Sequence, residues 1–84
     1  MNRIVFYTTL GCHLCEQAEA MLSYLLKKGE WYAVDIAEDD QLIEEYGTKI
    51  PVLSLEGGDH LLHWPFNLEQ LIDWIQLIDG SHSL

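Results

Sequence analysis

Basic residues are scarce in this sequence. Its 84 residues include four Lys and Arg against 14 Asp and Glu, which gives a formal net charge of −10. Nucleic acids and anionic membrane surfaces bind proteins mainly through Lys and Arg, so we expect neither as a partner. No segment approaches the roughly 20 apolar residues that a transmembrane helix needs. The acidic surface would attract basic partners, or would only keep the domain in solution, and the composition leaves both open.

Cysteine is equally scarce, because Cys12 and Cys15 are the only two. A structural zinc site needs four ligands, usually Cys and His, and this set is incomplete. His13 lies between the cysteines, while His60 and His63 fall in an expected strand, where odd spacing directs side chains to opposite faces. We therefore expect no metal ion and no bound cofactor. A structural zinc site and an inert buried pair of thiols remain as alternatives to a redox function.

The length and composition fit one small domain. We expect it to span residues 1–80, with a frayed tail at 81–84. Residues 1–3 lead straight into a strand-like segment, without the pattern of a secretory signal. A C-x-x-C with no wider disulfide framework is typical of a reducing compartment, so we expect a cytoplasmic protein, by default a monomer.

Hydrophobic periodicity predicts seven elements in the order β-α-β-α-β-β-α. A strand followed by a helix and a second strand forms a right-handed crossover, so the first two strands should be parallel. The turn at 56–59 should make the last two strands antiparallel. The expected strands cover 3–8, 30–36, 51–55 and 60–64, and the expected helices run from residue 12 or 13 to about 28, from about 38 to 46, and from 68 to about 80.

The last helix has clear local signals at its start, and hydrophobic spacing predicts the buried faces of the last two helices. Asn67 is a good N-cap, Gln70 occupies the capping-box position, and Phe66 with Leu71 has the spacing of a hydrophobic staple. The residues expected to face inward are Leu42, Ile43 and Tyr46 in the short helix, and Leu68, Leu71, Ile72, Ile75 and Ile78 in the last one.

The position of Cys12 and Cys15 favours redox chemistry. They follow the first strand and open the first helix. A thiol attacks as its thiolate, which the unpaired N–H groups of a helix N-terminus stabilise. The second cysteine lies one turn further on the same face and can close a disulfide. This pairing of an attacking thiol with a nearby resolving thiol is what thiol–disulfide exchange requires.

With these features the chain resembles the thioredoxin superfamily, and within it glutaredoxin-like proteins of bacterial type. The resemblance is carried by residues 6–15 (FYTTLGCHLC), by residues 46–53 (YGTKIPVL) and by the order of the elements. It covers nearly the whole chain. It implies an α/β fold of the thioredoxin/glutaredoxin type, with a four-stranded mixed sheet flanked by three helices.

The resemblance also implies roles for single residues. Cys12 is similar to the family's exposed nucleophile and Cys15 to its resolving thiol. Pro51 matches the family's cis-proline, and Ile50 would pair its backbone with a bound substrate as an added strand. The other residues expected at the substrate site are Gly11, His13, Leu14, Lys49 and Trp64, with Lys49 as a carboxylate clamp and Trp64 as one wall of a groove. For Trp64 and Phe66, packing of the last helix is the alternative.

Three departures from the glutaredoxin pattern bear on glutathione. His13-Leu14 replaces Pro-Tyr, Thr9 replaces a lysine, and residues 64–67 (WPFN) replace the Gly-Gly-x-x-Asp segment. Glutathione is a net anion, as is this domain, so these changes weaken the expectation that glutathione binds.

The predicted function is therefore that of a small thiol–disulfide oxidoreductase acting on a protein or small-molecule disulfide. Two alternatives remain: a glutathione-linked glutaredoxin whose binding site has drifted, and a non-catalytic module that senses redox state or binds a partner.

Overall fold

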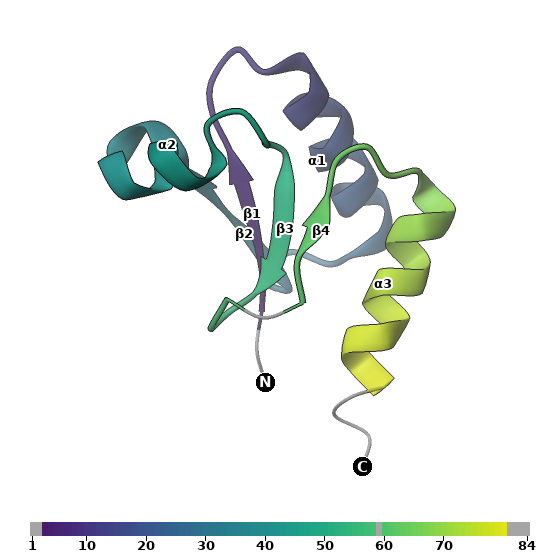
Figure 1. Cartoon of the computed structure of the whole chain (residues 1–84). Helices are drawn as coiled ribbons and strands as arrows, with labels where there is room; N and C mark the ends of the chain where they lie inside the picture. The colour runs from purple at the N-terminus through teal and green to yellow at the C-terminus, as the bar shows by residue number, and fades with distance from the viewer. Residues whose placement is uncertain (1–2, 59, 81–84) are drawn as a thin grey trace.

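The computed structural model describes residues 3–58 and 60–80. Its strands and helices follow the predicted order, with one additional 3₁₀ turn (Figure 1). The strands are β1 (Ile4–Thr8), β2 (Trp31–Asp35), β3 (Val52–Leu55) and β4 (Leu62–His63), and the helical elements are α1 (His13–Leu25), η1 (Ile36–Glu38), α2 (Asp40–Tyr46) and α3 (Leu68–Gly80).

The strands form one mixed sheet in the order β2-β1-β3-β4. β1 pairs in parallel with β2 and antiparallel with β3, and β3 pairs antiparallel with β4, which confirms the predicted pairings. β1 is a central strand, and its first three residues are buried. This position explains why the strand is apolar on both faces. The fold is thus the α/β, thioredoxin-like arrangement that the resemblance implied.

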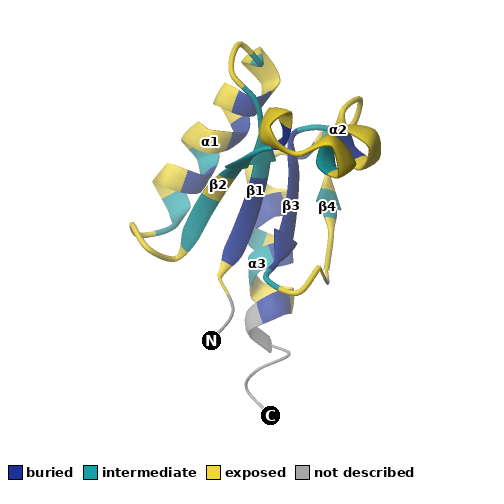
Figure 2. Ribbon diagram, turned by 90° about the vertical axis from the view of Figure 1, so that its left-hand side faces the viewer, coloured by how far each residue is buried: buried dark blue, intermediate teal, exposed yellow. Residues whose placement is uncertain are grey.

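The main core lies between the sheet and two helices, α1 and α3. Phe6 and Leu53 from the sheet, Leu22 from α1 and Leu71 from α3 are fully buried in one cluster. Figure 2 shows this layer as buried central strands with α1 and α3 packed behind them. Most of the buried hydrophobic residues of the described chain belong to this layer, and burial of a large apolar side chain contributes about 1.5–3 kcal/mol.

The opposite face of the sheet is covered by α2 at one end. Tyr46 is buried with Ile36 and Val52, and its ring stacks on that of Tyr7 at a centroid distance of 4.5 Å. The inward orientation predicted for Ile43 is wrong, because its side chain is 43% exposed. A helix of two turns that covers only the end of a sheet has room for few inward positions.

The signals at the start of α3 are confirmed. The Gln70 N–H donates to the Asn67 side chain at 2.8 Å, and the Asn67 N–H donates to the Gln70 side chain at 2.9 Å. Phe66 and Leu71 are both buried, as a staple requires. Of the predicted stripe, Leu71 and Ile78 are buried and Ile72 and Ile75 are half-buried.

The remaining member of that stripe, Leu68, is exposed, so its prediction as an inward residue is wrong. Trp74 is buried instead, between the two ends of the stripe. The helix therefore turns a slightly different face to the sheet than the aliphatic residues alone indicated.

α1 ends three residues earlier than predicted. Leu26 leaves the helical conformation, and Gly29 at φ +97° allows a turn in which the Glu30 N–H donates to the Lys27 carbonyl. The Glu30 carboxylate also accepts a hydrogen bond from the Lys27 N–H at 2.6 Å. These turn hydrogen bonds replace the last helical ones.

β4 has two residues instead of the five predicted. His60 has a left-handed φ of 59°, and its carbonyl accepts a hydrogen bond from the Trp74 indole at 2.9 Å. The chain before Leu62 is thus held by α3 instead of the strand ladder. Asp59 of the predicted turn and the predicted tail at 81–84 lie outside the described residues. No helix in the described part of the chain combines the length and hydropathy that crossing a membrane requires.

Candidate functional site

The candidate site lies where β1 and β2 end and β3 begins (upper end in Figure 1). In the observed register Thr8 pairs with Asp35, and Tyr7 pairs with Val52. One step beyond Tyr7 and Val52 the same register brings Pro51 opposite Thr8. In open α/β sheets, functional loops follow the carboxyl ends of the parallel strands, and residues 9–12 form such a loop here.

Cys12 is the N-cap residue of α1. The residue is half-buried, and its Sγ accepts a hydrogen bond from the Cys15 N–H at 3.2 Å. Gly11, at φ +79°, provides the turn that brings the chain from β1 into this position. A sulfur in this place faces one of the unpaired N–H groups of the helix end, which stabilises negative charge on it.

Cys15 has a different environment, although it is only one turn away. Its side chain is 2% exposed and belongs to the main core. Burial, reinforced by the neighbouring Cys12 sulfur, raises the pKa of Cys15 to about 11, against the opposing hydrogen bonds of Thr8 and Thr9. Both cysteines are free thiols. The pair therefore consists of an accessible sulfur at a helix end and a buried, protonated one.

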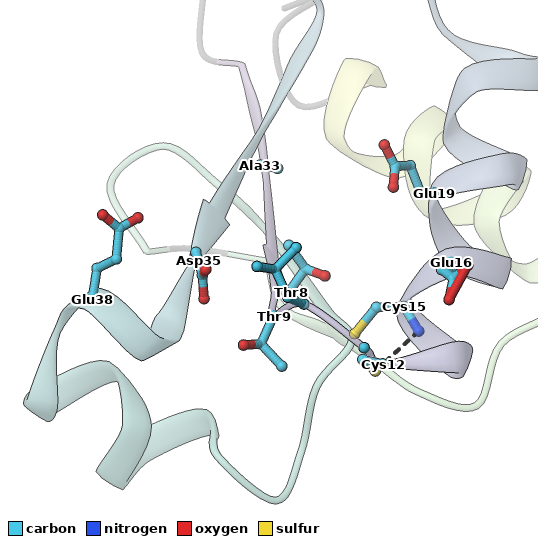
Figure 3. A pocket seen from close by; sticks show the side chains of 11 residues that line it. Thr8, Thr9, Cys12, Cys15, Glu16, Glu19, Ala33, Asp35 and Glu38 are labelled. Atoms are coloured by element: carbon cyan, nitrogen blue, oxygen red, sulfur yellow. Dashed lines mark hydrogen bonds between the residues drawn. The ribbon is translucent and has the colours of Figure 1, made fainter.

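A pocket of about 520 Å³ lies beside Cys12, and the buried Cys15 forms part of its lining. Its walls are contributed by the β1–α1 loop, the first turns of α1, β2 and η1 (Figure 3). The lining residues are Thr8, Thr9, Leu10, Gly11, Cys12, Cys15, Glu16, Glu19, Ala33, Asp35 and Glu38. This volume falls in the usual range of ligand-binding pockets.

The pocket is acidic. Its lining includes four carboxylates and no Lys or Arg. In Figure 3, Glu16 and Glu19 lie on the α1 side of the thiols, and Asp35 and Glu38 lie on the other side. The Asp35 carboxylate is held in place, because it accepts a hydrogen bond from the Ala37 N–H at 2.9 Å. A negatively charged substrate would be repelled from this entrance.

The predicted site residues are divided between two surroundings. Cys12, Cys15 and Gly11 line the pocket. The exposed His13 and Leu14 follow Cys12 on the first turn of α1, and the imidazole Nδ1 of His13 lies 3.7 Å from the Glu16 carboxylate. Neither of these two side chains lines the pocket.

The other four predicted residues lie toward β3 and β4. Pro51 is buried, and the Ile50–Pro51 peptide bond is cis, as the resemblance implied. Ile50 is half-buried, and Trp64 packs against the main core and meets Phe66 edge-to-face at 4.9 Å. Lys49 is exposed. Packing of Phe66 is thus observed, while a substrate role for the four predicted residues stays a prediction.

Sequence reasoning missed the acidic wall formed by Asp35 and Glu38. The strand predicted at 30–36 includes Asp35, but the sequence pattern does not identify Thr8 as the residue that lies beside it in the sheet. The available signal was the parallel pairing of the first two strands, which places their carboxyl ends side by side. Residues 35–40, which begin with the last residue of the second strand, contain four acidic side chains, so this pairing brings negative charge beside the thiols.

Within residues 3–58 and 60–80 no three His, Cys, Asp or Glu side chains are grouped as metal ligands. The acidic pocket thus differs from the clusters that hold Zn²⁺ or Ca²⁺, where three or more ligand atoms converge on one point.

Comparisons with known proteins identify the family. The model of the glutaredoxin-like domain (DUF836) matches residues 3–76. Protein XcR50 from X. campestris has a crystal structure similar to this one, with 34% identity and a TM-score of 0.77 over 88% of this chain and 96% of that one.

Protein Ne2328 from Nitrosomonas europaea has a similar solution structure, with 30% identity and a TM-score of 0.68 over 87% of this chain and 89% of that one. No functionally curated protein matches. The thioredoxin-like fold, the C-x-x-C at the start of α1 and the family match agree, and the chain belongs to the glutaredoxin-like domain family (DUF836).

Proposed function

We propose that this protein is a thiol–disulfide oxidoreductase in which Cys12 attacks a substrate disulfide and Cys15 resolves the intermediate. The observation that carries the proposal is the difference between the two thiols. Cys12 is accessible and receives an N–H hydrogen bond at a helix end, whereas Cys15 is buried and its pKa is raised to about 11. An exposed disulfide can therefore reach Cys12 but not Cys15.

The reaction proceeds in two exchanges. The Cys12 thiolate forms a bond to one substrate sulfur, and the other substrate sulfur leaves as a thiolate and takes up a proton. The Cys15 sulfur then bonds to the Cys12 Sγ, and the second substrate sulfur leaves with the proton that Cys15 loses. The substrate gains two electrons and becomes two thiols, while the protein becomes the Cys12–Cys15 disulfide.

Burial of Cys15 has a function in this scheme. Its high pKa keeps Cys15 protonated in the reduced protein, so that it does not compete with Cys12 for a substrate disulfide. In the resolving step its proton passes to the substrate sulfur as that sulfur leaves. Because Cys15 lies one helical turn away, the disulfide closes locally. A cytoplasmic location is part of the proposal, since a reducing compartment returns both thiols to the free state.

A single-turnover measurement tests this function. The reduced protein is mixed with an uncharged peptide disulfide, and released peptide thiol and protein disulfide are quantified together. We expect two peptide thiols for each Cys12–Cys15 disulfide formed, and no release by Cys12→Ser. Failure of the reduced wild-type protein to release thiol from a peptide that dithiothreitol reduces would contradict the proposal.

A further inference from the structure

The carboxylates of the pocket surround the thiols on two sides. Glu16 and Glu19 come from α1, and Asp35 and Glu38 come from β2 and η1 (Figure 3). Among the described residues no Lys or Arg forms an ion pair with any of the four, and only His13 lies near one, Glu16. A disulfide that reaches Cys12 through this pocket must therefore pass between unneutralised negative charges.

Negative charge continues outside the pocket over α2 and the residue before it. Four more carboxylates lie on this part of the chain, and all of them are exposed: Asp39, Asp40, Glu44 and Glu45. This surface adjoins the Glu38 wall of the pocket, because η1 leads directly into α2. Exposed carboxylates thus continue along the chain beyond the pocket lining, from Glu38 through α2.

The basic residues are concentrated at the other end of the molecule. Lys27 and Lys28 follow the far end of α1, about 20 Å from Cys12 along the helix. Arg3 precedes β1, about 16 Å from Thr8, and pairs with Glu56 at 3.5 Å. Of the four Lys and Arg, only Lys49 lies at the thiol end, and it does not line the pocket.

Exposed leucines flank the nucleophile. Leu10, which lines the pocket, is 92% exposed, and Leu14, in the first turn of α1, is 43% exposed. Exposed apolar side chains beside a reactive thiol provide contact area for a polypeptide, which a small charged disulfide would not use.

From these four observations we propose that the preferred substrate is a disulfide within a basic polypeptide segment, whose Lys or Arg side chains occupy the acidic pocket beside Cys12. This inference rests on the proposed oxidoreductase function and adds the substrate class. The substrate's cations pair with Asp35, Glu38, Glu16 and Glu19, while the disulfide lies against the Cys12 sulfur.

The substrate's charge also assists the reaction. Negative charge develops on the departing sulfur during each exchange, and the surrounding carboxylates oppose it. Lys or Arg bound between them offsets this repulsion. A basic disulfide should therefore meet Cys12 more often and react faster once bound. Glutathione disulfide, which is anionic, should meet it less often and react more slowly.

The test compares three peptides of equal length that differ only at the residues flanking a single cysteine: Lys, Gln or Glu. Each carries the same thionitrobenzoate leaving group, whose release gives the second-order rate constant with the reduced protein. We expect the Lys peptide to react at least about tenfold faster than the Gln peptide at low salt, and the Glu peptide to react more slowly than both. The differences should shrink at 0.5 M NaCl, where charges are screened.

Two double variants locate the effect. Asp35→Asn with Glu38→Gln should reduce the preference for Lys over Gln at least about threefold. Glu69→Gln with Asp73→Asn removes the same charge from exposed positions of α3 and should leave the preference unchanged. Two small disulfides are measured as well: cystamine, which is dicationic, and glutathione disulfide. Each rate constant with the protein is divided by the rate constant of the same disulfide with dithiothreitol, which corrects for intrinsic reactivity.

The outcomes separate the two proposals. If no peptide reacts, the oxidoreductase function itself is wrong. If the Gln peptide reacts but the Lys peptide reacts no faster, or the α3 variant lowers the preference as much as the pocket variant, the substrate class is wrong. If cystamine, after the same correction with dithiothreitol, reacts as fast as the Lys peptide or faster, the inference that the substrate is a polypeptide is wrong.

Discussion

At the scale of single residues, the central feature is that two cysteines three positions apart have opposite environments. Cys12 lies outside the regular helix as its N-cap, where the Cys15 N–H donates to its sulfur. Cys15 lies inside the helix and points into the core beside Ala18 and Leu22. The position of Cys12 at the helix end places its thiol at the surface, whereas the first turn carries the Cys15 thiol into the interior. The different roles proposed for the two cysteines rest on this difference.

The buried thiol predicts a pH dependence of stability. The pKa of Cys15 is about 11 in the fold against 9.0 for a free thiol, so the folded state holds this proton more tightly. The contribution is complete below pH 9 and is lost as the pH rises through 11, at up to about 1.4 kcal/mol per pH unit. Urea unfolding of the reduced protein at pH 8, 9 and 10 measures it.

The matched control for this measurement is Cys15→Ser, whose hydroxyl does not titrate in this range. The other titratable side chains are common to both proteins, so their contributions cancel in the comparison. We expect the unfolding free energy of the wild type to fall more steeply than that of the variant. Equal slopes would mean that burial does not raise the pKa of Cys15.

At the scale of elements, local signals determined some structures, and contacts between elements determined others. The start of α3 was predictable, because Asn67 and Gln70 bond to each other within one turn. The length of β4 was not, because the hydrogen bond from Trp74 to the His60 carbonyl joins residues 14 positions apart. The local sequence pattern thus predicts that a helix or strand exists more reliably than it predicts where that element begins and ends.

The same distinction applies to the candidate site. Cys12 and Cys15 could be found from sequence, because their spacing and the helix after them are local. The acidic wall could not be predicted in that way, because Asp35 lies beside Thr8 only through the pairing register of two strands. A shift of the register by one residue would direct Asp35 to the other face of the sheet.

The cap of α3 gives a prediction at this scale. Asn67→Ala removes the acceptor for the Gln70 N–H at 2.8 Å and should lower the unfolding free energy by about 1 kcal/mol. Gln76→Ala, at an exposed position of the same helix, is the control and should change it by less than about 0.5 kcal/mol. Urea unfolding compares the two, and an equal effect would show that the capping box contributes nothing measurable.

At the scale of the whole molecule, charge is both large and unevenly placed. The formal net charge is −10, with carboxylates at the thiol end and three of the four Lys and Arg at the other. A high net charge destabilises a compact state through self-repulsion. The same field that selects a basic substrate therefore has a cost in stability that salt should relieve.

This cost predicts that NaCl stabilises the protein. Between 20 and 300 mM NaCl, the stability should rise by about 1 kcal/mol, which corresponds to a Tm increase of about 4–8 °C for a domain of this size. The variant Glu44→Gln with Glu45→Gln, which removes two exposed charges from α2, should be more stable than wild type at low salt and should respond less to NaCl. A Tm that is unchanged or falls with NaCl would contradict the account.

The assignment of Cys12 as nucleophile and Cys15 as resolving thiol is tested most directly by the intact mass of two single-cysteine variants. Cys15→Ser and Cys12→Ser are each exposed to the same peptide disulfide, and the fraction carrying one peptide is measured over time. We predict a stable adduct on Cys12 in Cys15→Ser and essentially none in Cys12→Ser, because the remaining thiol of the latter is 2% exposed. Adduct formation at equal rates in the two folded variants would contradict the assignment.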